Sequence, residues 1–510
     1  MVRICRGWQV IDMPPILKSQ LLADVPPEWP LDVFPDIQVA LRRDGRKVVV
    51  LDDDPTGTQT VHGVPVLTEW SVERLSNELR SDLPCVYVLT NTRAMPLVQA
   101  QALNAEIGQN LVQASRQVGR EMVLISRSDS TLRGHFPGET DALVAAMSAR
   151  IDGTLIIPAF MAGLRRTIND VHYVGTMRED GEWLTPAGET EFAQDKAFGY
   201  QASNLKAWVA EKSAGRVSAD AVGAITLDHI RRGGPDAVMR YLMQMQSNRV
   251  CIVNAVDERD LSVAVLGIMR AEQAGRRYLF RTAASFVQWR AGIASRPLLS
   301  RADLLRDNGV DADVKTGGLI LVGSYVPKTS AQLAALLQRC ATGNLYALEI
   351  EATRLIDTDT CAAEIARVVQ QADLQLQQGR DVVIYTSRAL ISGMSAADNL
   401  MIGGRVSAGL VQVVQQLSLR PQELRPQELR PQSLRPRYVL AKGGITSSDI
   451  ATIGLGVRRA MVLGQILPGV PVWQLGAETQ WPGMPYIVFP GNVGGEQALL
   501  DVVTNLAQGI

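Results

Sequence analysis

Short apolar runs alternate with helix-like stretches along the first half of the chain. The runs are rich in β-branched residues, and the stretches between them carry apolar residues at helical spacing, most clearly over Leu97–Val118 and Glu139–Ala149. This alternation is typical of a parallel sheet covered by helices on both faces. The predicted strands occupy Lys47–Leu51, Cys85–Leu89, Met122–Ile125, Gly153–Pro158, Ala221–Thr226, Val250–Asn254 and Tyr278–Arg281.

The second half repeats the pattern after a polar region, residues 297–316, that lacks clear periodicity. We therefore predict an α/β fold with two α/β domains, each built on a mainly parallel sheet. An N-terminal arm covers residues 1–44, the first domain 45–300 and the second 315–510. The predicted strands of the second domain are Gly318–Val322, Asp381–Tyr385, Tyr438–Ala441 and Tyr486–Phe489, with helices at about Ser330–Arg339, after Thr446 and from Glu496.

Proline marks two segments that do not fit this alternation. Residues 13–35 are proline-rich and predict an irregular arm on the first domain. Leu-Arg-Pro-Gln recurs at Leu419, Leu424 and Leu429, and a degenerate fourth copy ends at Arg437. A five-residue period with a proline in every copy matches neither helix nor strand. Residues 419–437 are therefore predicted to form an exposed insertion, with a proline-rich docking motif as the alternative.

The composition is that of an ordinary globular protein. The 510 residues are 46% hydrophobic and 20% charged, and the net charge of −1 provides no basic field to recruit nucleic acid or an anionic membrane. The five cysteines are scattered without a CxxC pair, which favours the reducing cytoplasm over a disulfide framework or a zinc site. The four histidines are equally dispersed, and no apolar run reaches the length of a membrane span.

Polar, chemically capable side chains are concentrated in the segment Ser126–His135, which follows a predicted strand. The guanidinium groups of Arg127 and Arg133 are suited to clamp a carboxylate or phosphate. Asp129 and the serine and threonine hydroxyls of the segment match the hydroxyl groups of a sugar. The segment predicts a site for a polyhydroxylated anion; an internally salt-bridged loop without a ligand is the alternative.

Carboxylates cluster where the first strand ends, at Asp52, Asp53 and Asp54. Because adjacent carboxylates repel one another, the cluster indicates a use: holding Mg²⁺, binding substrate hydroxyls or accepting a proton. A helix N-cap followed by a solvated turn is the structural alternative. Asn91 and Arg93 follow the next strand, and the carboxyl ends of parallel strands meet at one edge of a sheet, so a shared crevice is expected there.

Glycine-rich turns follow three predicted strands of the second domain, at Gly323-Ser324, Gly443–Thr446 and Gly491–Gly495. Glycine allows backbone N–H groups to approach a phosphate closely, and a helix start adds partial positive charge. Together the turns predict a nucleotide site. Neither GxxxxGK[ST] nor GxGxxG occurs, which argues against a P-loop and against a dinucleotide fold.

Two further stretches of the first domain are less specific. Gly181–Phe192 is polar and predicts either a flap over the site or a surface loop with one buried tryptophan, Trp183. The methionine-containing helix Val238–Met245 is interpreted as core.

These motifs resemble those of the four-carbon acid sugar kinases, which phosphorylate small sugar acids such as threonate, erythronate and 3-oxo-tetronates with ATP. Asp53–Gly57 looks like the family's Asp-Asp-x-Thr-Gly opening, and Arg127–Gly134 looks like its Asp-Ser-Thr-Leu-Arg-Gly signature. The glycine turns of the second domain fall where the family's nucleotide-binding segments lie. The resemblance extends from about residue 45 to the C-terminus.

The resemblance implies an N-terminal substrate domain, a C-terminal ATP domain, an active-site cleft between them, and Mg²⁺ on the ATP phosphates with unassigned protein ligands. Asp53 and Asp129 are the expected catalytic residues, with Asp53 favoured as the base. The expected substrate-binding residues are Asp54, Asn91, Arg93, Arg127 and Arg133. The expected ATP contacts are Ser324, Gly443, Gly444, Ile445, Thr446 and Gly491.

Several features set this chain apart from shorter members: the N-terminal arm, the third carboxylate at Asp52, Pro55 inside the opening motif, and an insertion at Gly181–Gly199. They indicate a longer subgroup, for which a branched acid such as 3-oxo-isoapionate is a further substrate. We expect a cytoplasmic enzyme of carbohydrate catabolism whose partners are a sugar acid and ATP, with neither nucleic acid nor membrane; a homo-oligomer remains open.

Two other functions compete with the kinase. A non-catalytic sensor of a sugar acid and a nucleotide is opposed by the aspartates of the opening motif, since a sensor needs no base. A dehydrogenase lacks its dinucleotide fingerprint.

Overall fold

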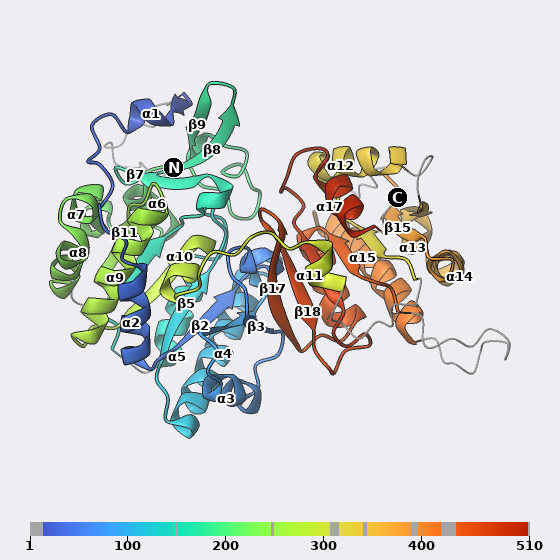
Figure 1. Ribbon diagram of the computed structural model, residues 1–510, viewed down its shortest axis with the longest axis horizontal. Helices are drawn as coiled ribbons and strands as arrows, with labels where there is room; N and C mark the ends of the chain where they lie inside the picture. Colours follow the sequence, from blue (N-terminus) through green and yellow to red (C-terminus); the bar gives the residue numbers. More distant parts are fainter. Residues whose placement is uncertain are drawn as a thin grey trace. The chain divides into compact units, whose positions relative to one another are not determined.

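The computed structural model describes residues 14–147, 150–245, 249–305, 316–339, 344–388, 396–419 and 435–507. The chain forms two compact units, drawn in Figure 1. Unit 1 combines Met1–Asp53 with Trp70–Ala294, and unit 2 combines Asp54–Glu69 with Ser295–Ile510. Both units carry a mainly parallel sheet with helices, so the predicted α/β fold is confirmed. The segment Asp54–Glu69 belongs to unit 2, although it lies early in the sequence.

Unit 1 is built on a parallel sheet whose strands follow the predicted apolar runs. Its strands are β2 (Lys47–Asp52), β4 (Cys85–Leu89), β5 (Met122–Arg127), β6 (Gly153–Ile157), β10 (Gly223–Ile225), β11 (Arg249–Val253) and β12 (Tyr278–Thr282). They are arranged in the order β10-β11-β6-β12-β5-β2-β4, and every pairing is parallel. The register aligns Asp52 and Thr282 with Arg127, so the polar ends of three strands meet at one edge.

The helices of unit 1 pack in two groups beside this sheet. One group contains α3 (Val72–Arg80), α4 (Leu97–Val118) and α5 (Gly138–Met147); the other contains α2 (Phe34–Asp44), α8 (Gly234–Met243), α9 (Glu258–Gln273) and α10 (Ala284–Arg290). Helix α4 has the predicted bounds and ends at Gly119, whose positive φ of 71° suits the left-handed C-cap. Val238, Leu242 and Met245 are buried, which confirms the core interpretation of this stretch.

A small antiparallel sheet in unit 1 was not predicted. Its strands are β1 (Ile16–Leu17), β7 (Arg165–Ile168), β8 (Val171–Arg178) and β9 (Gly181–Pro186), in the order β1-β9-β8-β7. Strand β9 occupies the start of the stretch predicted as a flap or surface loop. Its buried residues are Leu184 and Pro186, whereas Trp183 is only partly buried, so the expectation of a buried tryptophan was wrong. Figure 1 shows β8 and β9 as a long two-stranded ribbon.

The proline-rich N-terminal segment is more regular than predicted. Strand β1 joins the antiparallel sheet, and a short helix, α1 (Lys18–Leu21), follows it directly. Helix α2 buries Ile37 and Ala40 and packs against α9 and α10. These elements form because each has apolar side chains to bury against unit 1.

Unit 2 contains a mixed sheet. Its strands are β3 (Val64–Leu67), β13 (Leu319–Val322), β14 (Leu345–Ile350), β15 (Asp381–Thr386), β16 (Val439–Lys442), β17 (Arg459–Leu467), β18 (Val470–Leu475) and β19 (Pro485–Phe489). The order is β3-β17-β18-β19-β16-β13-β15-β14. The pairings from β19 to β14 are parallel. Strands β3, β17 and β18 extend the same sheet with antiparallel pairings.

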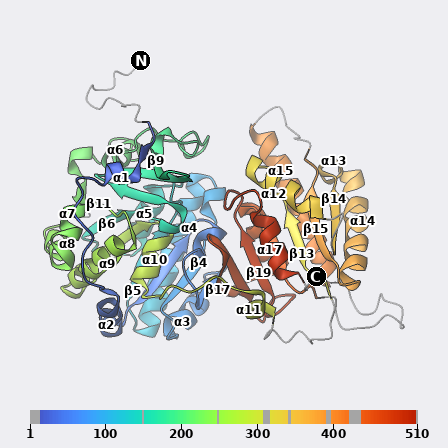
Figure 2. The same cartoon turned by 45° about the horizontal axis from the view of Figure 1, so that its top comes forward.

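Helices flank the parallel part of this sheet, and Figure 2 shows α13 (Ala352–Ile356) and α14 (Thr358–Gln377) beside β14 and β15. The other helices are α11 (Arg301–Leu305), α12 (Pro327–Gln338), α15 (Ala396–Leu419), α16 (Gly444–Asp449) and α17 (Ala498–Leu506). Helix α12 starts earlier than predicted because Pro327 occupies its first turn. Among the described helices, none is long and apolar enough to cross a membrane.

Two predicted irregular segments contribute to the core of unit 2. Leu299 and Leu304, in the polar boundary region, are buried in its main hydrophobic cluster. The repeat at 420–434 lies outside the described residues. Arg437, the last residue of the predicted insertion 419–437, is buried and donates to Asp381 Oδ1 at 2.6 Å, so the end of the degenerate copy is packed and not exposed.

Candidate functional site

A buried ion pair joins two strand ends of unit 1. Arg127, the last residue of β5, places Nη1 3.3 Å from Asp52 Oδ1 and 4.0 Å from Asp53 Oδ1. All three side chains are buried. The guanidinium therefore offsets the repulsion between the two carboxylates, which makes Arg127 a residue that holds the aspartates in place.

Asp53 has one satisfied and one unsatisfied oxygen. Ser128 Oγ donates to Asp53 Oδ2 at 2.5 Å. Asp53 Oδ1 is buried and has no hydrogen-bond partner within the described part of the chain. A buried carboxylate oxygen without a donor is costly, so its presence calls for an explanation. Asp53 Oδ1 is therefore suited to accept a hydrogen bond, and then a proton, from a ligand hydroxyl.

Asp129 differs from Asp53 because arginines surround it. Arg133 Nε donates to Asp129 Oδ2 at 2.6 Å, and Arg93 Nη1 lies 3.4 Å from Asp129 Oδ1. Thr131 Oγ1 also donates to this carboxylate. Burial alone raises the pKa of Asp129, but the charges of Arg133 and Arg93 outweigh burial and hold the pKa well below its usual range. Asp129 is thus a poor base that orients two arginines.

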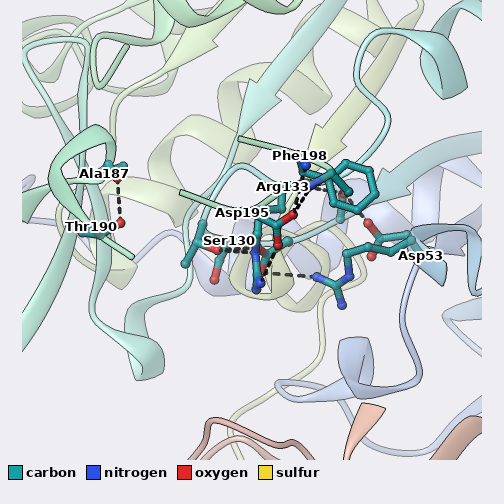
Figure 3. A network of polar contacts seen from close by, with 12 residues as sticks. Asp53, Ser130, Arg133, Ala187, Thr190, Asp195 and Phe198 are labelled. Atoms are coloured by element: carbon teal, nitrogen blue, oxygen red, sulfur yellow. Dashed lines mark hydrogen bonds and ion pairs between the residues drawn. The ribbon is translucent and has the colours of Figure 1, made fainter. Parts of the chain in front are cut away.

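The insertion after β9 supplies further partners for Arg133. Arg133 Nη1 lies 3.6 Å from Asp195 Oδ2, and its guanidinium stacks 5.2 Å from the ring centre of Phe192. Arg165 lies over the same ring at 5.8 Å. Figure 3 shows Arg133 and Asp195 within the polar network, with Phe198 and Asp53 nearby. The insertion therefore contributes directly to the arginine cluster.

Arg281 and Thr282, at the end of β12, were missed by the sequence analysis. Arg281 Nη2 donates to the backbone oxygen of Arg133 at 3.1 Å. Arg281 Nε and Thr282 Oγ1 are buried without a hydrogen-bond partner among the described residues. Burial lowers the pKa of Arg281, against the opposing effect of Asp53 and Glu139. A charged residue at the end of the predicted strand Tyr278–Arg281, followed by a threonine, was the signal that could have found them.

The loop after β4 is hydrogen-bonded to the end of β2, at Asp52 and Asp53. The backbone N–H groups of Asn91 and Arg93 donate to the carbonyls of Asp52 (3.4 Å) and Asp53 (3.3 Å). Thr92 Oγ1 donates to the buried Glu139, whose pKa is raised by burial and by the nearby Asp53 carboxylate. The structure thus brings Asn91 and Arg93 to the aspartates, as the shared-edge argument predicted.

A neutral histidine, His172, holds the loop that contains Ser130 in place through a hydrogen bond to its backbone. His172, on β8, is fully buried, with Nε2 2.8 Å from the Ser130 carbonyl and Nδ1 3.0 Å from Thr167 Oγ1. Burial lowers the pKa of His172 to about 4, so its ring is neutral at physiological pH. No local pattern indicated this role, because His172 lies in an unpredicted strand.

Gly134 is required by the geometry of the loop. Its φ is +119°, and a Cβ atom there would lie 2.7 Å from Ser128 Oγ and 3.2 Å from Asp53 Oδ2. We expect Gly134→Ala to displace the Ser128 hydroxyl and lower kcat by about a hundredfold or more. Steady-state kinetics test this, with Gly119→Ala as the control, because Gly119 also has a positive φ but no atom within 4 Å of its Cβ position. Equal kinetic effects of both variants would contradict the packing argument.

The three glycine turns of unit 2 come together. A Cβ atom on Gly443 would lie 3.0 Å from Ser324 Cβ, one on Gly323 would lie 2.5 Å from Thr446 Oγ1, and one on Gly491 would lie 3.2 Å from Ser324 Oγ. A Cβ atom at any of these positions would crowd its neighbour, and the φ of +120° at Gly443 favours glycine there in any case. Ser324, Gly443, Thr446 and Gly491 thus surround one point, while Ile445 beside them is 58% exposed.

Asp54 belongs to unit 2 and lies beside these turns. It caps the 3₁₀ helix η1 (Pro55–Thr58) by accepting from the Thr56 N–H at 2.8 Å. Asp54 Oδ2 is 3.2 Å from the position a Cβ would take on Gly444. The sequence analysis grouped Asp54 with the substrate residues, and that assignment stays a prediction; its carboxylate also lies close to the Gly444 turn.

A Mg²⁺ ion at this site would be bound partly by the protein and partly by the phosphates of the nucleotide. No group of three or more potential metal-ligating side chains occurs among the described residues. Mg²⁺ is usually bound by one or two carboxylates together with substrate phosphates and water. A single carboxylate beside the glycine turns, that of Asp54, fits this mode of binding.

Comparison with known proteins agrees with this two-part arrangement. A model described as the sugar-binding N-terminal domain matches residues 48–290, and one described as the nucleotide-binding C-terminal domain matches residues 319–499. D-threonate kinase of Salmonella typhimurium is 26% identical over 467 residues, covering 90% of this chain and 97% of the relative. The chain belongs to the four-carbon acid sugar kinase family.

Solved structures resemble the fold at low identity. Haemophilus influenzae protein HI1011 is 17% identical with a TM-score of 0.57, covering 90% of this chain and 99% of that one. A Salmonella typhimurium LT2 protein, whose proposed role is that of a tRNA synthase, is 17% identical with a TM-score of 0.60, covering 91% and 100%. At these identities the likeness concerns the fold alone.

Proposed function

We propose that this protein transfers a phosphoryl group from ATP to a hydroxyl of a small sugar acid in carbohydrate catabolism. The observation that carries the proposal is Asp53, whose buried, unsatisfied Oδ1 stands beside a cluster of arginines. A general base next to cations is the combination that a hydroxylated carboxylic acid needs. The similarity to D-threonate kinase supports the reaction class.

In unit 1, Asp53 takes the proton of the attacking hydroxyl while Ser128 holds its other oxygen. The substrate carboxylate is assigned to the guanidinium groups of Arg93 and Arg133, which Asp129 orients. The proposed substrates are four-carbon acids such as threonate, erythronate or a 3-oxo-tetronate, or a branched relative such as 3-oxo-isoapionate.

In unit 2, the backbone around Gly443, Gly444 and Gly491 is assigned to the ATP phosphates, with Ser324 and Thr446 as hydroxyl donors. Asp54 is the residue that would hold Mg²⁺. When bound, this ion neutralises charge on the phosphates. The expected cleft between the domains, the cytoplasmic location and the homo-oligomer remain predictions.

An ATP-consumption screen with Mg²⁺ tests the proposal against a panel of four- and five-carbon sugar acids, including 3-oxo and branched acids. We expect one acid to stimulate ATP consumption strongly and to yield a phosphorylated product by mass spectrometry. Gly443→Ala is the matched variant, because a Cβ there would lie 3.0 Å from Ser324 Cβ. It should weaken ATP binding while binding of the sugar acid persists.

The screen also distinguishes the competing functions. Tight binding of a sugar acid and of ATP without any phosphorylated product would identify a sensor. A change in nicotinamide absorbance with no ATP consumption would identify a dehydrogenase. Either result would overturn the proposal that this protein is a kinase.

A further inference from the structure

A fully buried lysine lies directly before the central glycine turn of unit 2. Lys442 is the last residue of β16, its side chain is 0% exposed, and Gly443 follows it. Its Nζ donates to the carbonyl of Pro490 at 2.6 Å and reaches that of Gly491 at 3.4 Å. The ammonium also lies 4.1 Å from the centre of the Phe489 ring. One side chain therefore ties the turn after β16 to the turn after β19.

A threonine of helix α12 shares the same acceptor. Thr329 Oγ1 donates to the Gly491 carbonyl at 3.0 Å and lies 3.2 Å from Ser324 Oγ. The Gly491 carbonyl thus accepts hydrogen bonds from both Lys442 and Thr329. Displacement of Lys442 would loosen the position of Gly491 relative to Ser324.

The charge of Lys442 is not balanced by the protein. Within the described residues it has no ion pair with a carboxylate. On neighbouring elements, Asp449 is hydrogen-bonded to a serine of α15, Glu496 is exposed, and Asp54 lies near Gly444. The charged group that most affects Lys442 is another cation, Lys328 of α12.

A buried, uncompensated cation is expensive, and a well-packed apolar side chain would usually serve stability better. Carbonyl oxygens and an aromatic face stabilise the ammonium only in part. Its presence directly beneath the turns assigned to phosphates indicates that an anionic ligand completes its environment.

We propose that Lys442 is the buried cation of the nucleotide site, which positions the Gly443 and Gly491 turns and whose charge is balanced by the phosphates of the bound nucleotide. This inference rests on the proposed function, because it requires unit 2 to bind ATP. It makes Lys442 a positioning residue for the nucleotide and assigns it no contact with the sugar acid.

The proposal implies that protonation and nucleotide binding are coupled. Burial and the charge of Lys328 lower the pKa of Lys442 to about 7 in the free protein. Bound phosphates favour the charged form and raise that pKa, so binding takes up a proton. The contribution of Lys442 to the affinity is therefore fully present below its pKa in the free protein and is lost as the pH rises through that pKa.

Isothermal titration calorimetry of the full-length protein with ATP, in buffers of different ionisation enthalpy, measures this proton directly. At pH 8 we expect uptake on the order of one proton per ATP bound. The nucleotide cannot mimic the signal, because a phosphate beside a cation loses its proton more readily and would release protons. Release, or no exchange at all, in the wild type would overturn the proposal.

The Lys442→Met variant provides the second test of the proposal. We expect its Kd for ATP to rise at least about 30-fold, its proton uptake to disappear, and KM for the sugar acid to remain unchanged. Lys47→Met is the matched control, because Lys47 is equally buried but donates to Ser81 and Leu83 in unit 1. This control should lose stability and keep its affinity for ATP.

The outcomes separate the two proposals. If the wild type does not bind ATP at all, the proposed function fails with this inference. If the wild type binds ATP and Lys442→Met binds it equally well, the inference fails alone. Should Lys442→Met not fold, Lys442→Gln and the wild-type proton measurement decide the question.

Discussion

Replacing Asp53 with asparagine is expected to lower kcat by about a thousandfold, the range of a general base, which corresponds to about 4 kcal/mol of transition-state stabilisation. Asparagine keeps the shape and can still accept the hydrogen bond from Ser128, but it cannot take up the hydroxyl proton. Steady-state kinetics with the sugar acid found by screening measure kcat, and calorimetry should give an unchanged Kd for ATP.

Asp129→Asn is the informative comparison for this variant. Asp129 is held ionised by Arg133 and Arg93, so its loss should disturb the arginines and raise KM for the sugar acid more than it lowers kcat. If Asp53→Asn keeps more than about a tenth of the wild-type kcat, Asp53 is not the base. A larger loss of kcat in Asp129→Asn would transfer that role to Asp129.

Arg127→Met is expected to cost both stability and activity. Removing one partner of a buried ion pair leaves Asp52 and Asp53 without their counter-charge, which costs roughly 3–5 kcal/mol of unfolding free energy. The two carboxylates then repel one another, and kcat/KM for the sugar acid should fall by about a hundredfold or more. Denaturant unfolding and steady-state kinetics measure the two effects, and the Kd for ATP should not change.

Arg231→Met separates stability from chemistry. Arg231 is a buried arginine with two aspartate partners, Asp257 at 2.6 Å and Asp260 at 2.7 Å, but it lies on α7 (Leu227–Arg231), outside the site. The Arg231→Met variant should lose about as much unfolding free energy as Arg127→Met and keep the wild-type kcat/KM. If both variants lose activity equally, the effect of Arg127 is only structural.

The sequence predicted what depends on local patterns. All parallel strands of unit 1, and four of the five in unit 2, were found because each is a continuous apolar run; β14 was missed because its apolar run is interrupted by Glu349. Helix α4 was found with its full bounds because its pattern and its terminal Gly119 agree. The meeting of Arg127 with the aspartates followed from the rule that parallel strands end at one edge. The closeness of the three glycine turns in unit 2 followed from the same rule.

The rest depends on contacts distant in sequence. His172 and Arg281 act through Ser130 and the Arg133 carbonyl, and no local motif announces such partners. The alternating strand β17 is only partly buried on one face, so its apolar signal is weak. Asp54 follows Asp53 directly, but only the packing of η1 on α16 reveals that it belongs with the glycine turns.

The pairing of β3 with β17 has a consequence for biosynthesis. Strand β3 is synthesised long before β17. The apolar strand β3 therefore stays unpaired with β17 in the nascent chain until synthesis is nearly complete. A gene fragment that starts at Ser295 would encode β17 without the strand that covers its edge, and uncovered edges promote aggregation. A soluble C-terminal fragment would therefore have to carry residues 54–69 through a linker, as a permuted chain.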